Sequence, residues 1–257
     1  MAYTPEQTAI LEREPVPPQG VTSAEVAYEV DGTACSGYVA RPDDDQTHPG
    51  VLVVHNWLGV TDAVRFRADM LARLGYVAFG GDVYGADVRP SGQEAAGVAG
   101  GFYGDQPLWR TRVTGAFDAM LAQDGVDPAR TAAIGYCFGG SSVLQLARTG
   151  ADLRGAVSFH GGLQTGPEGE AERIRAALLV RTGAADPIVP DEAVVALEDE
   201  LRGTDVDWQV VTYAGAMHAF TVPGTDAPDH GAQFQETAER RSWTAMKDFL
   251  GEVLHGA

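Results

Sequence analysis

Cysteine is scarce in this chain, which has Cys35 and Cys137 and no others among its 257 residues. Two cysteines do not make the disulfide framework of a small secreted domain, and neither belongs to a C-x-x-C pair of the kind used for zinc or redox chemistry. This usage is typical of a reducing compartment. We therefore expect a cytoplasmic protein, in which any special role for a cysteine comes from its immediate surroundings.

Positive charge is also in short supply. Lysine and arginine total 18 against 36 for aspartate and glutamate, so the net charge is −18. Such a chain lacks the basic footprint of a nucleic-acid-binding protein and is repelled by anionic membrane surfaces, so neither is an expected partner. With 44% hydrophobic and 21% charged residues, the composition is that of a soluble globular protein. We expect a small-molecule substrate and a monomer, with a homodimer as the alternative.

Long apolar runs are missing as well. No stretch approaches the roughly 18 apolar residues of a membrane span. Residues 1–20 lack the basic region and apolar core of a secretory signal. There is no internal repeat, and the length suits one domain over residues 1–257. Residues 1–23 are expected to form an irregular lead-in, because prolines cannot donate to a strand ladder.

The rest of the chain alternates between apolar bursts and helical patterns. The bursts that predict strands are 24–30, 35–41, 51–59, 76–85, 131–136, 154–162, 176–186 and 208–218. Helical spacing covers 61–74, 106–123, 141–149 and 236–254. This alternation predicts an α/β fold with a mainly parallel central sheet and helices on both faces. Ligands of such sheets bind beyond the carboxyl ends of the strands.

Residues 131–142, TAAIGYCFGGSS, place Cys137 at one of those ends. The pentapeptide G-x-C-x-G between a strand and a helix is typical of a nucleophile elbow, whose neighbours must be small. Gly135, Gly139 and Gly140 meet that need. The N–H groups at the helix start would stabilise a thiolate and a developing oxyanion. The alternative is that Cys137 simply packs as a small buried hydrophobe.

A cysteine nucleophile needs a base, and the base needs an acid that orients it. His218 follows the last predicted strand, whereas His55 and His160 are expected to be structural or pocket-lining histidines. Asp186 follows a buried strand and is preferred over Asp191, which starts a helix. The chain order nucleophile, acid, base is that of α/β-hydrolases.

An oxyanion hole normally takes one N–H from the residue after the nucleophile and another from the loop after an earlier central strand. Here these are the backbone N–H groups of Phe138 and Trp57. We expect the Trp57 ring to wall the pocket, the alternative being a core position.

These motifs resemble the dienelactone hydrolase family, the carboxymethylenebutenolidase-like α/β-hydrolases. The resemblance lies in GYCFGG, GAADPIVP and GAMHAF, preceded by VLVVHNWLGV and GYVAFGGDVYG, and it runs from about residue 25 to RRSWTAMKDFL. It implies a cofactor-independent, metal-free hydrolase with a Cys-His-Asp triad, whose matching positions are Cys137, His218 and Asp186.

The chain departs from the family's pattern at substrate-facing positions. Asn56 stands where the family has a glutamate that helps to ionise the cysteine, and Val222 stands where it has an arginine that holds a substrate carboxylate. Arg110 and Arg112 lie in the region of a second substrate-binding arginine. With Tyr84 and His160, these residues are our candidates for the substrate pocket.

The expected function is hydrolysis of an ester or lactone through a thioester acyl-enzyme. Alternatives are an acyltransferase or thioesterase using the same triad, and a non-catalytic binding protein that keeps the elbow as structure. A thiol redox sensor is disfavoured, because Cys35 belongs to an outer strand and offers no nearby resolving thiol.

Overall fold

The computed structural model describes residues 3–256 and divides into two compact units, Met1–Ala133 and Ile134–Ala257. Strand β5 (Val126–Tyr136) begins in the first unit and ends in the second. Within the described residues, no helix combines the length and the apolar character needed to cross a membrane.

The first unit contains a sheet in the order β1-β2-β4-β3. Strands β1 and β2 form an antiparallel hairpin around Asp31 and Gly32, and β3 and β4 run parallel. Its elements are α1 (Pro5–Leu11), β1 (Val21–Val30), β2 (Thr33–Pro42), β3 (His48–Val54), α2 (Asp62–Arg73), β4 (Val77–Gly81), α3 (Gly92–Gly104) and α4 (Gln106–Leu121).

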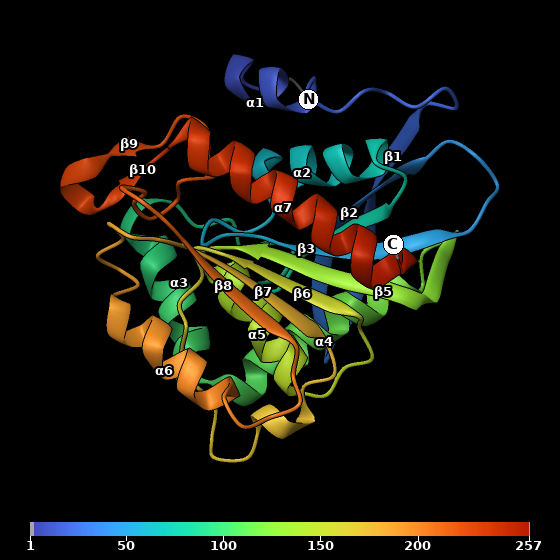
Figure 1. Ribbon diagram of the computed structural model, residues 1–257. Helices are drawn as coiled ribbons and strands as arrows, with labels where there is room; N and C mark the ends of the chain where they lie inside the picture. Colours follow the sequence, from blue (N-terminus) through green and yellow to red (C-terminus); the bar gives the residue numbers. More distant parts are fainter. Residues whose placement is uncertain (1–2, 257) are drawn as a thin grey trace. The chain divides into compact units, whose positions relative to one another are not determined.

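Helices α2 and α4 cover opposite faces of this sheet (Figure 1). Two adjacent glycines of β4 show why: a Cβ on Gly80 would meet Val64 of α2, and a Cβ on Gly81 would meet Ala116 of α4. Successive residues of a strand point to opposite faces. The two glycines therefore let both helices approach the sheet closely.

The prediction of an irregular lead-in over residues 1–23 is wrong. Helix α1 lies within it, because Thr4 accepts a hydrogen bond from the Gln7 N–H and the Gln7 side chain accepts one from the Thr4 N–H. This capping box and a proline in the first turn offset the shortness of the helix. Helix α3 was not expected either, since its glycines disguise the helical pattern.

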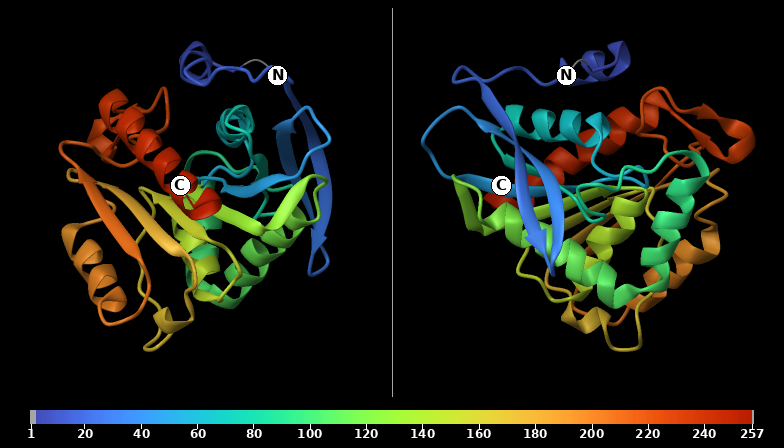
Figure 2. Two further views of the ribbon diagram at one scale, coloured as in Figure 1. Left: turned by 45° about the vertical axis from the view of Figure 1, so that its right-hand side comes forward. Right: turned by 180° about the vertical axis from the view of Figure 1, so that it is seen from behind.

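The second unit has three parallel strands in the order β6-β7-β8. Helix α7 lies on one face of these strands and α6 on the other, as the left view of Figure 2 shows. The elements are α5 (Phe138–Arg148), β6 (Gly155–Phe159), η1 (Ala171–Arg173), β7 (Ala177–Gly183), α6 (Asp191–Leu201), β8 (Trp208–Tyr213), β9 (Asp226–Ala227), η2 (Pro228–His230), β10 (Ala232–Gln233) and α7 (Glu236–His255). Parallel strands alternating with helices on both faces match the predicted α/β class.

Candidate active site

Cys137 sits between β5 and α5 in a backbone conformation that side chains rarely adopt. Its φ is 55° and its ψ is −116°, and it is the N-cap residue of α5. Its N–H donates to the Phe159 carbonyl at 3.0 Å, which ties the turn to the end of β6. A non-glycine residue at positive φ costs on the order of 1–3 kcal/mol and persists where its surroundings enforce it. The positive end of the helix dipole lies beside the sulfur.

The glycines around Cys137 are required by close backbone approaches. A Cβ on Gly135 would collide with the carbonyl oxygen of Gly139. A Cβ on Gly140 would lie 2.7 Å from the Ser158 Oγ and 2.9 Å from the Gly161 Cα. The elbow is therefore packed against both its own helix and the loop after β6, and no side chain fits at these positions.

His218 lies in the loop after β8 with its Nε2 3.1 Å from the Cys137 Sγ. Its backbone is held on both sides: the N–H donates to the Gly231 carbonyl at 2.9 Å, and the carbonyl accepts from the Gln233 N–H at 3.0 Å. The segment around β10 therefore fixes the backbone of His218 and, with it, the position of the imidazole relative to the sulfur.

Asp186 lies in the loop after β7 and contacts the other nitrogen of the same imidazole. Its Oδ2 is 2.9 Å from His218 Nδ1, and its Oδ1 accepts from the N–H groups of Ile188 (2.8 Å) and Val189 (3.2 Å). The carboxylate is fully buried. Asp191, the rival acid, is an exposed residue in the first turn of α6. The structure thus brings Cys137, His218 and Asp186 into one hydrogen-bonded row.

The electrostatics of the row favour a charged imidazole. Burial by itself opposes the charge on His218, but the hydrogen bonds that its ring donates to Asp186 and Cys137, together with the charges of these two groups, outweigh it. Together they raise the pKa of His218 to about 10. An imidazolium next to a cysteine sulfur is the arrangement that favours a thiolate at neutral pH.

His160 follows β6 and is completely buried. Its ring packs edge-to-face against the His218 ring with centroids 5.1 Å apart, and its Nε2 is 2.7 Å from the Thr221 Oγ1. Val222, a pocket candidate, is half-buried and closes a turn by donating from its N–H to the Ala219 carbonyl. Nothing in the sequence pattern marks Thr221, because its partner His160 lies 61 residues away along the chain.

The candidates from the loops after β3 and β4 lie in the first unit. Asn56 is 9% exposed, and its side-chain oxygen accepts from the Leu58 N–H at 2.9 Å. Trp57 is 40% exposed, so its ring is not a core residue. Tyr84 is buried against Phe102 and His55. The second oxyanion donor, Trp57 N–H, stays a prediction from the sequence.

His55 has a structural place in the same loop. It is fully buried, and its Nδ1 lies 2.6 Å from the Asn56 carbonyl while its Nε2 accepts from the Val83 N–H at 3.1 Å. Burial lowers its pKa to about 4, so the ring is neutral and carries its proton on Nδ1. His55 thereby ties the end of β3 to the loop after β4.

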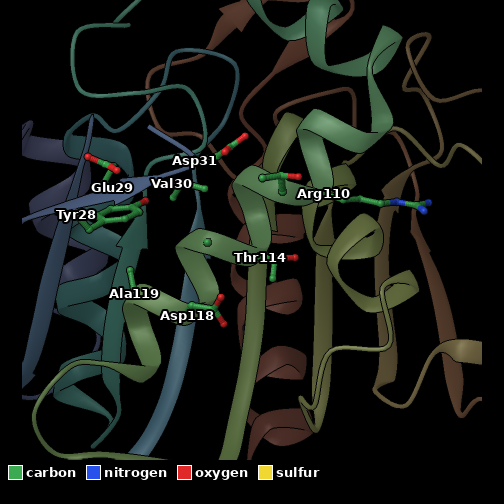
Figure 3. A pocket seen from close by; sticks show the side chains of 10 residues that line it. Tyr28, Glu29, Val30, Asp31, Arg110, Thr114, Asp118 and Ala119 are labelled. Carbon is green, nitrogen blue, oxygen red and sulfur yellow. The ribbon is translucent and has the colours of Figure 1, made fainter. Parts of the chain in front are cut away.

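The two arginine candidates lie on α4. Arg110 borders a pocket of about 680 Å³, and Figure 3 shows its side chain extending away from the other labelled side chains. Arg112 donates to the Thr33 hydroxyl and lies close to Cys35, whose thiol is buried. Their role in substrate binding stays a prediction. The residues lining the pocket all belong to the first unit: Tyr28, Glu29, Val30, Asp31, Arg110, Thr111, Thr114, Gly115, Asp118 and Ala119.

Comparisons with known proteins agree with this architecture. A crystal structure described as a dienelactone hydrolase-like promiscuous phosphotriesterase, P91, from metagenomic libraries is 41% identical, with 91% of this chain and 98% of that chain covered and a TM-score of 0.87. The solved structure m3DLH is 39% identical, with 91% and 99% covered and the same TM-score of 0.87. The uncharacterized protein K02A2.1 of Caenorhabditis elegans is 34% identical over 150 residues, which are 56% of this chain and 94% of that relative.

The likeness to the two solved structures confirms the α/β-hydrolase type of fold predicted from the sequence. The model of the dienelactone hydrolase family matches residues 35–254, which include both cysteines and every candidate site residue. The chain therefore belongs to the dienelactone hydrolase family, whose hydrolases act on carboxylic ester or lactone bonds.

Proposed function

We propose that this protein hydrolyses an ester or lactone with Cys137 as nucleophile, His218 as acid and base, and Asp186 as the group that orients His218. The observation that carries the proposal is the row of contacts at the elbow. Sγ and Nε2 are 3.1 Å apart, Nδ1 and Oδ2 are 2.9 Å apart, and the sulfur stands at the start of a helix. Nucleophile, base and orienting acid within hydrogen-bonding reach define a nucleophilic site.

In the first step the Cys137 thiolate attacks the carbonyl carbon and forms a tetrahedral intermediate. The carbonyl oxygen becomes an oxyanion, which the Phe138 N–H at the start of α5 would stabilise. When the intermediate collapses, the C–O bond breaks and the leaving alkoxide takes the proton from His218 Nε2. The product is a thioester on Cys137, with a free alcohol or, for a lactone, an opened ring that carries the hydroxyl.

In the second step the thioester is hydrolysed. The Cys137 charge helps to raise the pKa of His218, so acylation, which removes that charge, lowers the pKa. The neutral imidazole then accepts a proton from water as the hydroxide attacks the thioester carbonyl. Collapse then breaks the C–S bond, which releases the carboxylic acid and returns the negative charge to the sulfur beside the protonated His218. His218 thus serves as an acid in the first step and as a base in the second.

Hydrolysis of p-nitrophenyl acetate, followed by mass spectrometry of the quenched enzyme, tests this mechanism. We expect turnover together with one acetyl group on the peptide that contains Cys137. Cys137→Ala should lose both. Cys35→Ala is the matched control, because Cys35 is buried in β2 and should leave the rate unchanged. Turnover that survives in Cys137→Ala would exclude the thioester.

The alternatives from the sequence give different results in the same assay. An acyltransferase should form the acetyl-enzyme but release it faster when an alcohol or thiol acceptor is added in place of water. A non-catalytic binding protein should form no acetyl-enzyme at all, even though Cys137 is intact.

Phosphotriester hydrolysis is a second candidate activity, favoured by the 41% identity to the structure described as a promiscuous phosphotriesterase. Here the thiolate would attack phosphorus, expel an aryloxide and leave a phosphorylated sulfur for water to cleave. A neutral aryl phosphotriester tests this activity directly. Release of the aryl alcohol by the wild type and its loss in Cys137→Ala would support the candidate, whereas release by both or by neither would exclude it.

A further inference from the structure

We propose that His160 is a positioning residue, which together with Thr221 holds the His218 imidazole in line between Cys137 and Asp186. The inference concerns the same site as the proposed function and rests on it. The His160 side chain contacts the His218 ring and the Thr221 hydroxyl. Its role follows from what surrounds its ring and its backbone.

The ring of His160 is placed against the ring of the base. The His160 and His218 centroids are 5.1 Å apart at an interplanar angle of 66°. On another side the His160 ring meets the Phe220 ring edge-to-face, with centroids 5.2 Å apart at 77°. Since His160 and Phe220 are both fully buried, neither ring has room to turn away. The His218 ring is therefore backed by a packed surface on the side of His160.

The hydrogen bond from His160 to Thr221 fixes the turn that carries the base. His160 Nε2 and Thr221 Oγ1 are 2.7 Å apart, and Thr221 is three residues after His218. Ala219, between them, has a φ of 57°, and the Val222 N–H closes the turn on the Ala219 carbonyl. A turn held through a non-glycine residue at positive φ stores strain. The Thr221 anchor opposes the relaxation of that strain.

The backbone of His160 also connects to the nucleophile. The carbonyl of the preceding Phe159 accepts the Cys137 N–H at 3.0 Å, and the His160 N–H donates to the Arg181 carbonyl of β7 at 2.7 Å. His160 itself has a φ of 39°. The peptide bond between Phe159 and His160 is thus bonded to the backbone of Cys137. The His160 side chain is bonded to Thr221, in the turn that follows His218. Cys137 and His218 are held at a fixed separation through this residue.

Four variants of the full chain test the proposal. His160→Phe keeps a ring against His218 but removes the bond to Thr221, and Thr221→Val removes the same bond from the other side with little change of shape. Thr221→Ser restores a hydroxyl. Thr182→Val is the matched control: Thr182 is buried in β7, and its hydroxyl has no hydrogen-bond partner among the described residues.

We expect Thr221→Val and His160→Phe each to lower kcat for p-nitrophenyl acetate by about tenfold, with KM within about twofold, because the lost bond positions a catalytic group and binds no substrate. Thr221→Ser should recover most of the rate, and Thr182→Val should match the wild type. The double variant should lose no more than the worse single variant, since both changes remove one bond. Losses that multiply in the double variant would overturn the proposal, as would a Thr221→Val rate equal to that of Thr182→Val.

A second readout separates this proposal from the proposed function. Alkylation of Cys137 by iodoacetamide at neutral pH depends on the sulfur and His218 and needs no ester substrate. We expect Thr221→Val to slow the alkylation several-fold while Thr182→Val leaves it unchanged. Absent esterase turnover in the wild type would defeat the proposed function, yet this comparison would still decide the role of His160. Equal alkylation rates in the two variants would defeat the positioning role alone.

Discussion

The proposed nucleophile has a backbone conformation that side chains rarely adopt. Cys137 has a φ of 55° and a ψ of −116°, held by the close approach of Gly135 to Gly139 and by the bond from its N–H to Phe159. A glycine would adopt this conformation without strain. The chain therefore keeps a side chain at a position where the backbone favours none, as the proposed nucleophile requires.

Comparing two variants of Cys137 measures that strain. Cys137→Ala keeps a Cβ and should unfold at nearly the wild-type temperature, because the residue lies at the edge of the site. Cys137→Gly should be more stable than Cys137→Ala by about 1 kcal/mol, or about 2–4 °C in Tm, once the extra freedom of the unfolded glycine is subtracted. Differential scanning calorimetry of the two inactive variants gives this difference. If Gly is less stable than Ala by the full entropic cost of a glycine, about 0.5–1 kcal/mol, the elbow carries no strain.

The reactivity of Cys137 should depend on His218. Asn56 is an amide and cannot accept the thiol proton as a carboxylate can, so the imidazolium is the group expected to sustain the thiolate. We expect fast alkylation of Cys137 by iodoacetamide at neutral pH and a loss of about tenfold or more in His218→Ala, since an unassisted cysteine is only a few per cent thiolate there. Rates that do not respond to His218 would assign the ionisation to another group.

The raised pKa of His218 also predicts how stability depends on pH. Its value is about 10 in the folded chain against an ordinary value of 6.5. The stabilisation that comes with the proton is therefore complete below about pH 6.5 and is lost as the pH rises toward 10. The Tm of the wild type should fall across this window relative to that of His218→Gln. A constant Tm difference from pH 6 to pH 10 would contradict the ion pair.

At the scale of elements, the elbow depends on how closely α5 approaches the loop after β6. Gly140 is the contact point: a Cβ there would lie 2.7 Å from the Ser158 Oγ and 2.9 Å from the Gly161 Cα. Neither neighbour can move freely, because Ser158 belongs to β6 and the contacting atom of Gly161 is its Cα, a backbone atom. Helix α3 offers the contrast, since a Cβ on its Gly101 would meet nothing within 4 Å.

Alanine substitution at these two glycines should have opposite effects. Gly140→Ala forces α5 away from β6 and should destabilise the protein by about 1–3 kcal/mol. It should also lower kcat, because the elbow moves with the helix. Gly101→Ala should stabilise by about 0.5–1 kcal/mol and leave kcat unchanged. Chemical denaturation and the p-nitrophenyl acetate assay measure both effects. Equal stabilities in the two variants would show that the Gly140 contact relaxes without cost.

Elements with a clear period were predictable from the sequence, and those made by tertiary contacts were not. Phe66, Met70 and the Thr61 cap indicate α2, and the Thr61 hydroxyl does accept from the Ala63 N–H. The strand β10 has two residues and no pattern of its own. It exists because it pairs with β9 and because Gln233 and the preceding Gly231 bond to the backbone of His218. The contact between His160 and Thr221 escaped prediction for the same reason.

At the scale of the whole molecule, the net charge of −18 bears on which substrates arrive and bind. A negative field slows the approach of anions and is screened by salt. Val222, the position that matches the family's carboxylate-binding arginine, supplies no fixed cation. A neutral substrate is not repelled by the negative field and does not need a cation at the position of Val222.

We therefore expect a neutral dienelactone methyl ester to have a higher kcat/KM than the free acid, by about ten- to a hundredfold, since a charge-assisted bond to a carboxylate is worth about 1.5–3 kcal/mol. Raising the salt concentration should improve the free acid and leave the methyl ester unchanged. Steady-state kinetics at low and high salt test this. If the free acid has the higher kcat/KM at both salt concentrations, another cation, such as Arg110 or Arg112, binds the substrate carboxylate.

The contact between Pro187 and Gly231 bears on how this family can diversify. Gly231 has a φ of 73°, and a Cβ on it would collide with the Pro187 ring. Pro187 directly follows Asp186, and Gly231 accepts the N–H of His218. Surface loops usually tolerate insertions. These two loops pack directly on each other, so a residue inserted into either loop would require a compensating change in the other. Length variation among descendants of this chain should collect instead at exposed turns such as the one around Asp45, which carries none of the three residues of the proposed triad.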